Sequence, residues 1–169
     1  LVTWSLDQAL KEHEMLDETA NGVFTIAVTP FMPNGALDWD SIDRMVDFYI
    51  AKGATGLTIL GMMGEAGKLT ADESVTVVKR VIARSNVPVV VGVSAPGFAA
   101  MKTLSDASMD LGAAGVMVAP PSSLRTDGQI VTYYHDTAEA LGDAPFVLQD
   151  FPLVTNVVIP THVILKVVV

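Results

Sequence analysis

The residues with the clearest chemical potential lie in a glycine-rich loop, Gly61-Met62-Met63-Gly64-Glu65-Ala66-Gly67. The carboxylate of Glu65 could take part in acid–base chemistry, or it could tie down backbone amides beneath a site. Met62 and Met63 offer an apolar wall for a substrate, although methionine is also a common gap-filler in protein cores. This loop is therefore the first place where we expect a functional site.

Polar residues follow three other apolar runs of the chain. Gln149 could hydrogen-bond a substrate or a water molecule, or it could satisfy neighbouring backbone groups. Asp150 is more typical of a turn cap before Pro152 than of catalysis. Ser94 and Ser122 also follow apolar runs, where serine mostly serves turns. These residues are secondary candidates for the same site.

The sequence lacks the residues that several other kinds of chemistry require. The three histidines, His13, His135 and His162, are far apart in the sequence, and the carboxylates are not grouped with them, so we expect no metal site. The chain has no cysteine, which removes thiolate catalysis and disulfides. No G-x-S-x-G elbow or phosphate-binding glycine motif follows an apolar run, so we expect neither a serine hydrolase nor a bound cofactor.

Composition narrows the classes of partner. The net charge of −9 and the pI near 4.5 argue against a nucleic-acid surface, which needs clustered lysine and arginine. No stretch of about 18 apolar residues predicts a membrane span. Acidic residues within 1–20 argue against a signal or transit peptide, so we expect a cytoplasmic protein.

Five short apolar runs alternate with amphipathic, helix-like stretches. The runs are Phe24–Val28, Gly56–Leu60, Val87–Val93, Gly115–Val118 and Phe146–Leu148. Strands buried on both faces look like this, so the pattern predicts an α/β protein with a parallel sheet covered by helices. In such folds chemistry collects at the carboxyl ends of the strands, and the candidate residues above follow these runs.

The chain divides into an arm and five repeated units. Residues 1–21 are predicted to form an N-terminal helix or arm, and residues 22–169 to form five βα units. Asp38 or Asp40 can begin the first helix, and Thr70-Ala71-Asp72-Glu73 fits a capping box that begins the second. Further helices are expected over about 98–111 and 129–141 and after Pro160.

Two architectures fit five βα units. They could form a complete flavodoxin-like open sheet, or they could be the first five units of a (β/α)8 TIM barrel. The apolar segments 157–159 and 163–169 favour the barrel, because they look as if further chain should cover them. A docked terminal helix would also be apolar, so periodicity alone leaves both architectures open.

Four blocks of the sequence resemble, in order and spacing, the dihydrodipicolinate synthase and N-acetylneuraminate lyase family of class I (Schiff-base) lyases. They are Ala27-Val28-Thr29-Pro30-Phe31, Gly61-Met62-Met63-Gly64-Glu65, Pro88-Val89-Val90-Val91-Gly92-Val93 and Leu148-Gln149-Asp150-Phe151-Pro152. The resemblance implies a (β/α)8 barrel in a homo-oligomer, a dimer or tetramer. It also implies that a small 2-keto acid such as pyruvate binds as an imine on a lysine of strand six.

The resemblance assigns roles to particular residues of this chain. It implies that backbone N–H groups of the glycine-rich loop hold the keto-acid carboxylate, which needs no particular side chain. The substrate-binding residues that it implies are Thr29, Gly61, Met62, Met63, Gly64, Glu65 and Ser122. Gln149 stands at the position of the family's proton-shuttling tyrosine and is the one candidate catalytic residue.

The chain departs from the family pattern at its proton relay. Met62 and Met63 replace two threonines, and the amide of Gln149 cannot practically exchange a proton as a phenol can. By family spacing the imine-forming lysine falls beyond Val169, and neither Lys68 nor Lys166 is assigned its role.

We therefore expect a lyase, aldolase or dehydratase that acts on a small 2-keto acid and is not the synthase itself. The 169 residues alone are expected to be inactive. The alternative is a non-catalytic relative that binds keto acids or serves a structural role.

Overall fold

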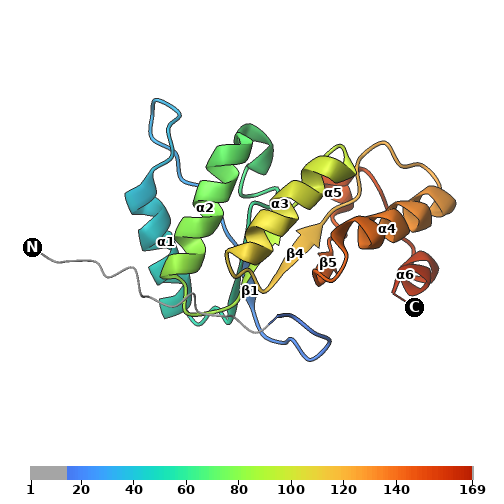
Figure 1. Cartoon of the computed structure of the whole chain (residues 1–169), viewed down its shortest axis with the longest axis horizontal. Coiled ribbons are helices and arrows are strands. Elements are labelled where there is room, and N and C mark those ends of the chain that lie inside the picture. Colours follow the sequence, from blue (N-terminus) through green and yellow to red (C-terminus); the bar gives the residue numbers. More distant parts are fainter. Residues whose placement is uncertain (1–14, 169) are drawn as a thin grey trace, which may run out of the picture.

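The computed structural model describes residues 15–168 and contains one parallel sheet (Figure 1). Its strands lie side by side in the order β1-β2-β3-β4-β5, the order in which they occur along the chain. Their bounds are Phe24–Ile26, Gly56–Ile59, Val89–Gly92, Gly115–Val118 and Phe146–Leu148. Sequential order is that of a barrel wall, whereas a flavodoxin-like sheet places its first strand between the second and third. The barrel prediction is confirmed, and the flavodoxin-like alternative is wrong.

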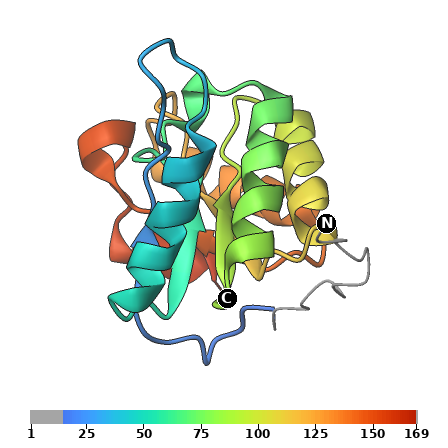
Figure 2. The same ribbon diagram turned by 90° about the vertical axis from the view of Figure 1, so that its left-hand side faces the viewer.

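Four helices cover one face of the sheet, and neighbouring helices along the chain pack against each other (Figure 2). They are α1 (Trp39–Ala51), α2 (Ala71–Arg84), α3 (Phe98–Asp110) and α4 (Asp127–Leu141). Three shorter elements complete the described chain: η1 (Ala66–Lys68), α5 (Pro152–Thr155) and α6 (Thr161–Val167). The main core lies between the sheet and these helices and is formed by valine, leucine and isoleucine side chains of both layers.

Side-chain caps explain where the longer helices begin. The carboxylate of Asp38 accepts a bond from the backbone N–H of Ser41 at 3.0 Å and begins α1. The expected capping box of Thr70 and Glu73 begins α2. A second capping box, Thr126 with Gln129, begins α4 at Asp127, two residues before the expected start. Each box satisfies backbone N–H groups that the first helical turn leaves without a partner.

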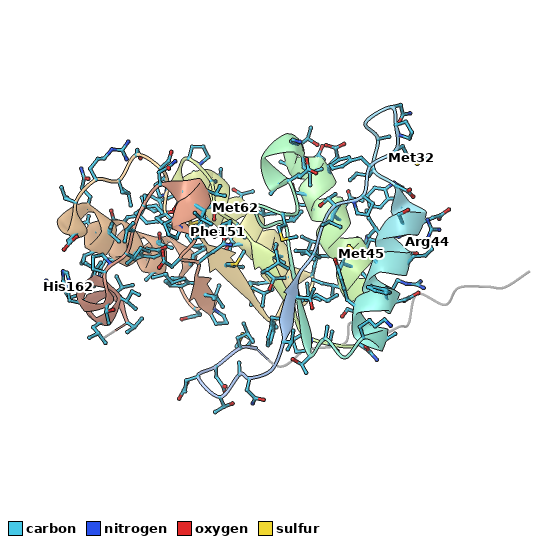
Figure 3. All side chains as sticks on the ribbon, turned by 180° about the vertical axis from the view of Figure 1, so that it is seen from behind. Met32, Arg44, Met45, Met62, Phe151 and His162 are labelled. Carbon is cyan, nitrogen blue, oxygen red and sulfur yellow. The ribbon has the colours of Figure 1, made fainter. Side chains whose placement is uncertain are left out.

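The opposite face of the sheet is not covered by α1–α4 (Figure 3). Alternate residues of the strands point to this side, among them Ile26, Thr58, Val90, Met117 and Val147, and they line a cavity of about 320 Å³. The two edge strands β1 and β5 are only three residues long, and Val147 of β5 is 43% exposed. Thr58, Val90 and Met117 of the central strands are buried, and residues 16 and 20–22 line the same cavity. An apolar face turned away from the helices is what the inner surface of a partly closed barrel wall presents.

The expected N-terminal helix or arm lies mostly outside the described residues, which begin at Met15. Residues 15–21 contain a turn, and the backbone N–H of Leu16 donates to the carbonyl of Ala114 at 2.8 Å. This bond holds the segment beneath the amino end of β4. Among residues 15–168, no helix is long and apolar enough to cross a membrane.

Candidate active site

The glycine-rich loop after β2 turns sharply because two of its residues have left-handed backbone conformations. Leu60 has a φ of 54° and Glu65 a φ of 52°. Gly92 of β3 makes the first turn possible, since a Cβ there would lie 2.3 Å from the carbonyl oxygen of Leu60. The loop therefore folds back over the end of β3 only because residue 92 has no side chain.

Thr29 anchors the far end of this loop. Its hydroxyl donates to the carbonyl oxygen of Gly64 at 2.6 Å, and the Thr29 residue is buried. Gly64 packs against the main chain, because a Cβ there would lie within 3.3 Å of Leu60 and of the Ala27 carbonyl. Thr29 and Gly64 thus fix the path of the loop from below, and neither lines the cavity described next.

A cavity of about 490 Å³ opens at the carboxyl ends of β2 to β5. Gly61 and Met62 form one wall, and Gln149 lines the cavity after β5. Met117 lies in the base, with its terminal methyl group 3.2 Å from where a Cβ of Gly61 would be. The loops after β2, β3 and β5 and Met117 of β4 therefore contribute to one concave surface.

The main chain of the loop offers free donors beside this cavity. Within residues 15–168, the backbone N–H groups of Met62 and Met63 donate to no protein acceptor, although the Met62 carbonyl accepts from Glu65 at 3.1 Å. Adjacent N–H groups without protein partners can bind the oxygens of a small anion. The arrangement suits a carboxylate and does not depend on the methionine side chains.

The charged side chains that line the cavity, among the residues described, are Glu65 and Lys68. They form an ion pair with each other across the short helix η1. Residues three apart eclipse in such a helix, which brings the ammonium to the carboxylate. Glu65 therefore neither ties down loop amides, as one interpretation expected, nor faces the cavity as an isolated carboxylate.

Gln149 lies where its amide can meet a ligand. Its backbone N–H continues the sheet by donating to the Val118 carbonyl at 2.9 Å, and among residues 15–168 its side chain forms no hydrogen bond. Among residues 15–168, no tyrosine lines this cavity. Tyr134 is buried and donates to the Val118 carbonyl at 3.4 Å, and burial raises the pKa of its phenol far above the usual value.

The structure brings together some of the expected site residues and separates others. Gly61, Met62, Glu65 and Gln149 line the cavity, with Lys68 and Ser94 beside them. Ser122 lines a neighbouring cavity, while the side chain of Met63 is 57% exposed and lines neither. The substrate-binding and catalytic roles of all these residues remain predictions. No group of three or more potential metal ligands occurs in the part of the chain that the structure describes.

Comparison with known proteins identifies the family of this chain. Residues 19–168 match the Dihydrodipicolinate synthetase family. The chain belongs to this family. It is 40% identical over 140 residues to the 4-hydroxy-tetrahydrodipicolinate synthase of Sorangium cellulosum, a match that covers 78% of this chain and 45% of the relative. The corresponding Pseudomonas aeruginosa enzyme is 31% identical over 134 residues, with 78% and 46% covered.

Solved structures of the family have the same arrangement of strands and helices. The crystal structure of dihydrodipicolinate synthase from Rhodopseudomonas palustris is 53% identical and superposes with a TM-score of 0.89, covering 92% of this chain and 52% of that one. The Acinetobacter baumannii enzyme, complexed with pyruvate, is 27% identical with a TM-score of 0.79, covering 86% and 51%. This family chain therefore spans about half the length of the relatives that it matches.

Proposed function

We propose that this chain provides the substrate-binding half of a class I lyase, aldolase or dehydratase that acts on a small 2-keto acid such as pyruvate. The observation that carries the proposal concerns two backbone N–H groups without a partner among residues 15–168: that of Met62, which lines the cavity at the strand ends, and that of the adjacent Met63. Family membership supports the chemistry, and the solved relative with bound pyruvate supports the substrate class.

The proposed reaction needs a lysine on residues that follow the five βα units. Its amine attacks the keto carbon, the carbonyl oxygen leaves as water, and the protonated imine accepts electrons from the bond that breaks next. The cradle of residues 61–64 binds the substrate carboxylate and so fixes the keto carbon relative to that amine. Gln149 orients the bound acid by hydrogen bonding but transfers no proton.

Borohydride reduction tests this proposal on the protein as its native gene encodes it. With pyruvate present, we expect a mass gain of one reduced pyruvate per chain, located on a lysine outside residues 1–169. Without pyruvate, borohydride should leave the mass unchanged. A protein that binds pyruvate but is never trapped would refute the imine mechanism, and a protein that does not bind pyruvate would refute the whole proposal.

One observation favours a second function. By the resemblance to the family, Met62, Met63 and Gln149 stand where the threonine and tyrosine hydroxyls of its proton relay are expected. A non-catalytic protein could keep the carboxylate cradle without them and bind keto acids reversibly. Binding of pyruvate without turnover of any acid in a keto-acid panel would support this alternative. Cytoplasmic location and assembly into dimers or tetramers also remain predictions.

A further inference from the structure

Leu60 breaks the alternation of side chains along β2. Successive residues of a strand point to opposite faces of the sheet. Leu57 and Ile59 belong to the core between the sheet and the helices, here called the helix-side core, and Thr58 lines the cavity on the opposite face. By this alternation Leu60 would point to the same side as Thr58, yet it belongs to the helix-side core and is only 3% exposed.

The left-handed backbone of Leu60 accounts for this break. Changing φ from the extended value of about −120° to 54° turns the Cβ by about half a revolution around the N–Cα bond. Left-handed conformations are costly for a residue such as leucine, and they persist only where the surrounding structure enforces them. Burial of the Leu60 side chain in the helix-side core is such a contact, because an extended backbone would withdraw the side chain from it.

The main chain of Leu60 lies between two glycines that pack closely against it. A Cβ at Gly92 would lie 2.3 Å from the Leu60 carbonyl oxygen, and a Cβ at Gly64 would lie 3.1 Å from the Leu60 nitrogen and 3.2 Å from its Cα. Leu60 is thus in contact with β3 and with the returning end of the loop. The cradle follows it directly in the chain, so a shift of Leu60 would move the N–H groups of the cradle.

From these contacts we propose that Leu60 is a positioning residue of the keto-acid site. Its side chain anchors the left-handed turn in the helix-side core, and the turn aims the N–H groups of the cradle at the substrate carboxylate. Leu60 also borders the cavity, but it acts through the main chain of the loop. This inference rests on the proposed function and adds a core side chain to the machinery of that site.

Two measurements on the protein as its native gene encodes it test this role together. Leu60→Ala loses the anchor and keeps the costly backbone conformation, so we expect the dissociation constant of pyruvate, measured by calorimetry, to rise at least about tenfold. Amide hydrogen exchange of the segment 61–65 without pyruvate should also accelerate at least about tenfold, because opening of the loop becomes less costly. Unchanged exchange would overturn the positioning role even if binding weakens, because Leu60 would then act by direct contact with the ligand.

Leu57→Ala is the matched control. Leu57 lies in the same strand and is also buried in the helix-side core, but it precedes the loop by three residues. The variant removes the same atoms as Leu60→Ala and should also lower stability, yet it should leave the affinity for pyruvate and the exchange of the loop unchanged. Equal weakening of binding in Leu57→Ala and Leu60→Ala, at a temperature where both are folded, would show a general effect of core truncation and overturn the inference.

Two further variants separate the side-chain anchor from the backbone conformation. Leu60→Gly adopts the left-handed conformation without cost but lacks the anchor, so it should bind pyruvate as weakly as Leu60→Ala. It also carries the test if Leu60→Ala does not fold. Leu60→Met keeps most of the buried volume and should bind pyruvate nearly as tightly as the unsubstituted protein. Binding of unsubstituted strength in Leu60→Gly, or no recovery in Leu60→Met, would overturn the role of the side chain.

The two proposals fail in different ways. If the unsubstituted protein does not bind pyruvate, the proposed function is overturned, and hydrogen exchange still decides whether Leu60 anchors the loop. If borohydride traps pyruvate but Leu60→Ala binds it as tightly as the unsubstituted protein, the proposed function stands and the positioning role of Leu60 is wrong.

Discussion

Replacing Gly92 with alanine tests whether the carboxylate cradle depends on a close approach of two backbones. The added Cβ would lie 2.3 Å from the carbonyl oxygen and 2.8 Å from the carbonyl carbon of Leu60. An unstrained carbon–oxygen contact is about 3.3 Å, so the Leu60 carbonyl must retreat by about 1 Å. Because both partners are main chain, no rotation of a side chain can relieve the collision.

Overpacking of a filled region costs about 1–3 kcal/mol, and a collision between backbones belongs at the upper end of this range. We therefore expect Gly92→Ala to lower the free energy of unfolding by about 3 kcal/mol. For a chain of this length, the melting temperature should then fall by roughly 6–12 °C. Pyruvate binding should weaken too, because the displaced Leu60 leads directly into Gly61. Circular dichroism during urea and thermal unfolding measures the first effect, and calorimetry the second.

Gly128→Ala is the matched control, because a Cβ at Gly128 would have no neighbour within 4 Å. Gly128 lies in the first turn of α4, where alanine costs less conformational entropy than glycine and stabilises a helix by up to about 1 kcal/mol. The two glycine-to-alanine variants should therefore shift stability in opposite directions. Equal stability of Gly92→Ala and Gly128→Ala would refute the close-approach argument.

Three further predictions concern a buried hydrogen bond, a helix cap and an exposed ion pair. Thr29→Val should lower the free energy of unfolding by about 1–3 kcal/mol and weaken pyruvate binding, because the buried Gly64 carbonyl loses its donor. Thr29→Ser keeps the hydroxyl and should retain both the stability and the pyruvate binding. Hydrogen bonds from Ser41 lower the pKa of Asp38 below its usual 3.8. The ionised Asp38 side chain therefore stabilises the folded protein above pH 3.8, and this contribution is lost as the pH falls through the lowered pKa. In Asp38→Asn the free energy of unfolding should therefore fall less steeply on acidification below pH 3.8 than in the unsubstituted protein, as measured by acid unfolding. Hydrogen bonds from Arg84 likewise lower the pKa of Asp47. In Arg84→Gln that pKa should rise towards 3.8, and the loss of stability that Asp47 contributes on acidification should disappear. Unchanged titration of Asp47 by NMR would contradict this.

The parts of the fold that the sequence predicts best are those with one dominant physical cause. Strands β2, β3 and β4 are buried on both faces, so their residues form continuous apolar runs, and the expected bounds of β4 are confirmed. The capping box at Thr70 is equally local and is confirmed. The similar box at Thr126 was missed although its Thr-x-x-Gln pattern is present in the sequence.

Other features depend on contacts between residues that are distant in sequence. Periodicity could not choose between a barrel and an open sheet, because strand order is set by which strands pair and not by their composition. The helix α5 is a single turn with no apolar stripe, and the strand-two loop could be recognised only as a glycine-rich segment. The ion pair of Glu65 with Lys68 and the cavity between the loops after β3 and β4 follow from three-dimensional arrangements that no single motif encodes.

The division between main chain and side chain would allow the proposed site to differ chemically from its relatives while keeping one binding mode. The path of the cradle is fixed by backbone contacts at Gly92 and Gly64 and by the hydroxyl of Thr29. The substituted positions, Met62 and Gln149, instead face the cavity. Replacing those side chains would change the size and hydrogen bonding of the cavity without moving the backbone N–H groups that we propose bind the carboxylate. Substitution of Met62 should therefore leave the proposed carboxylate binding in place, because those N–H groups belong to the main chain.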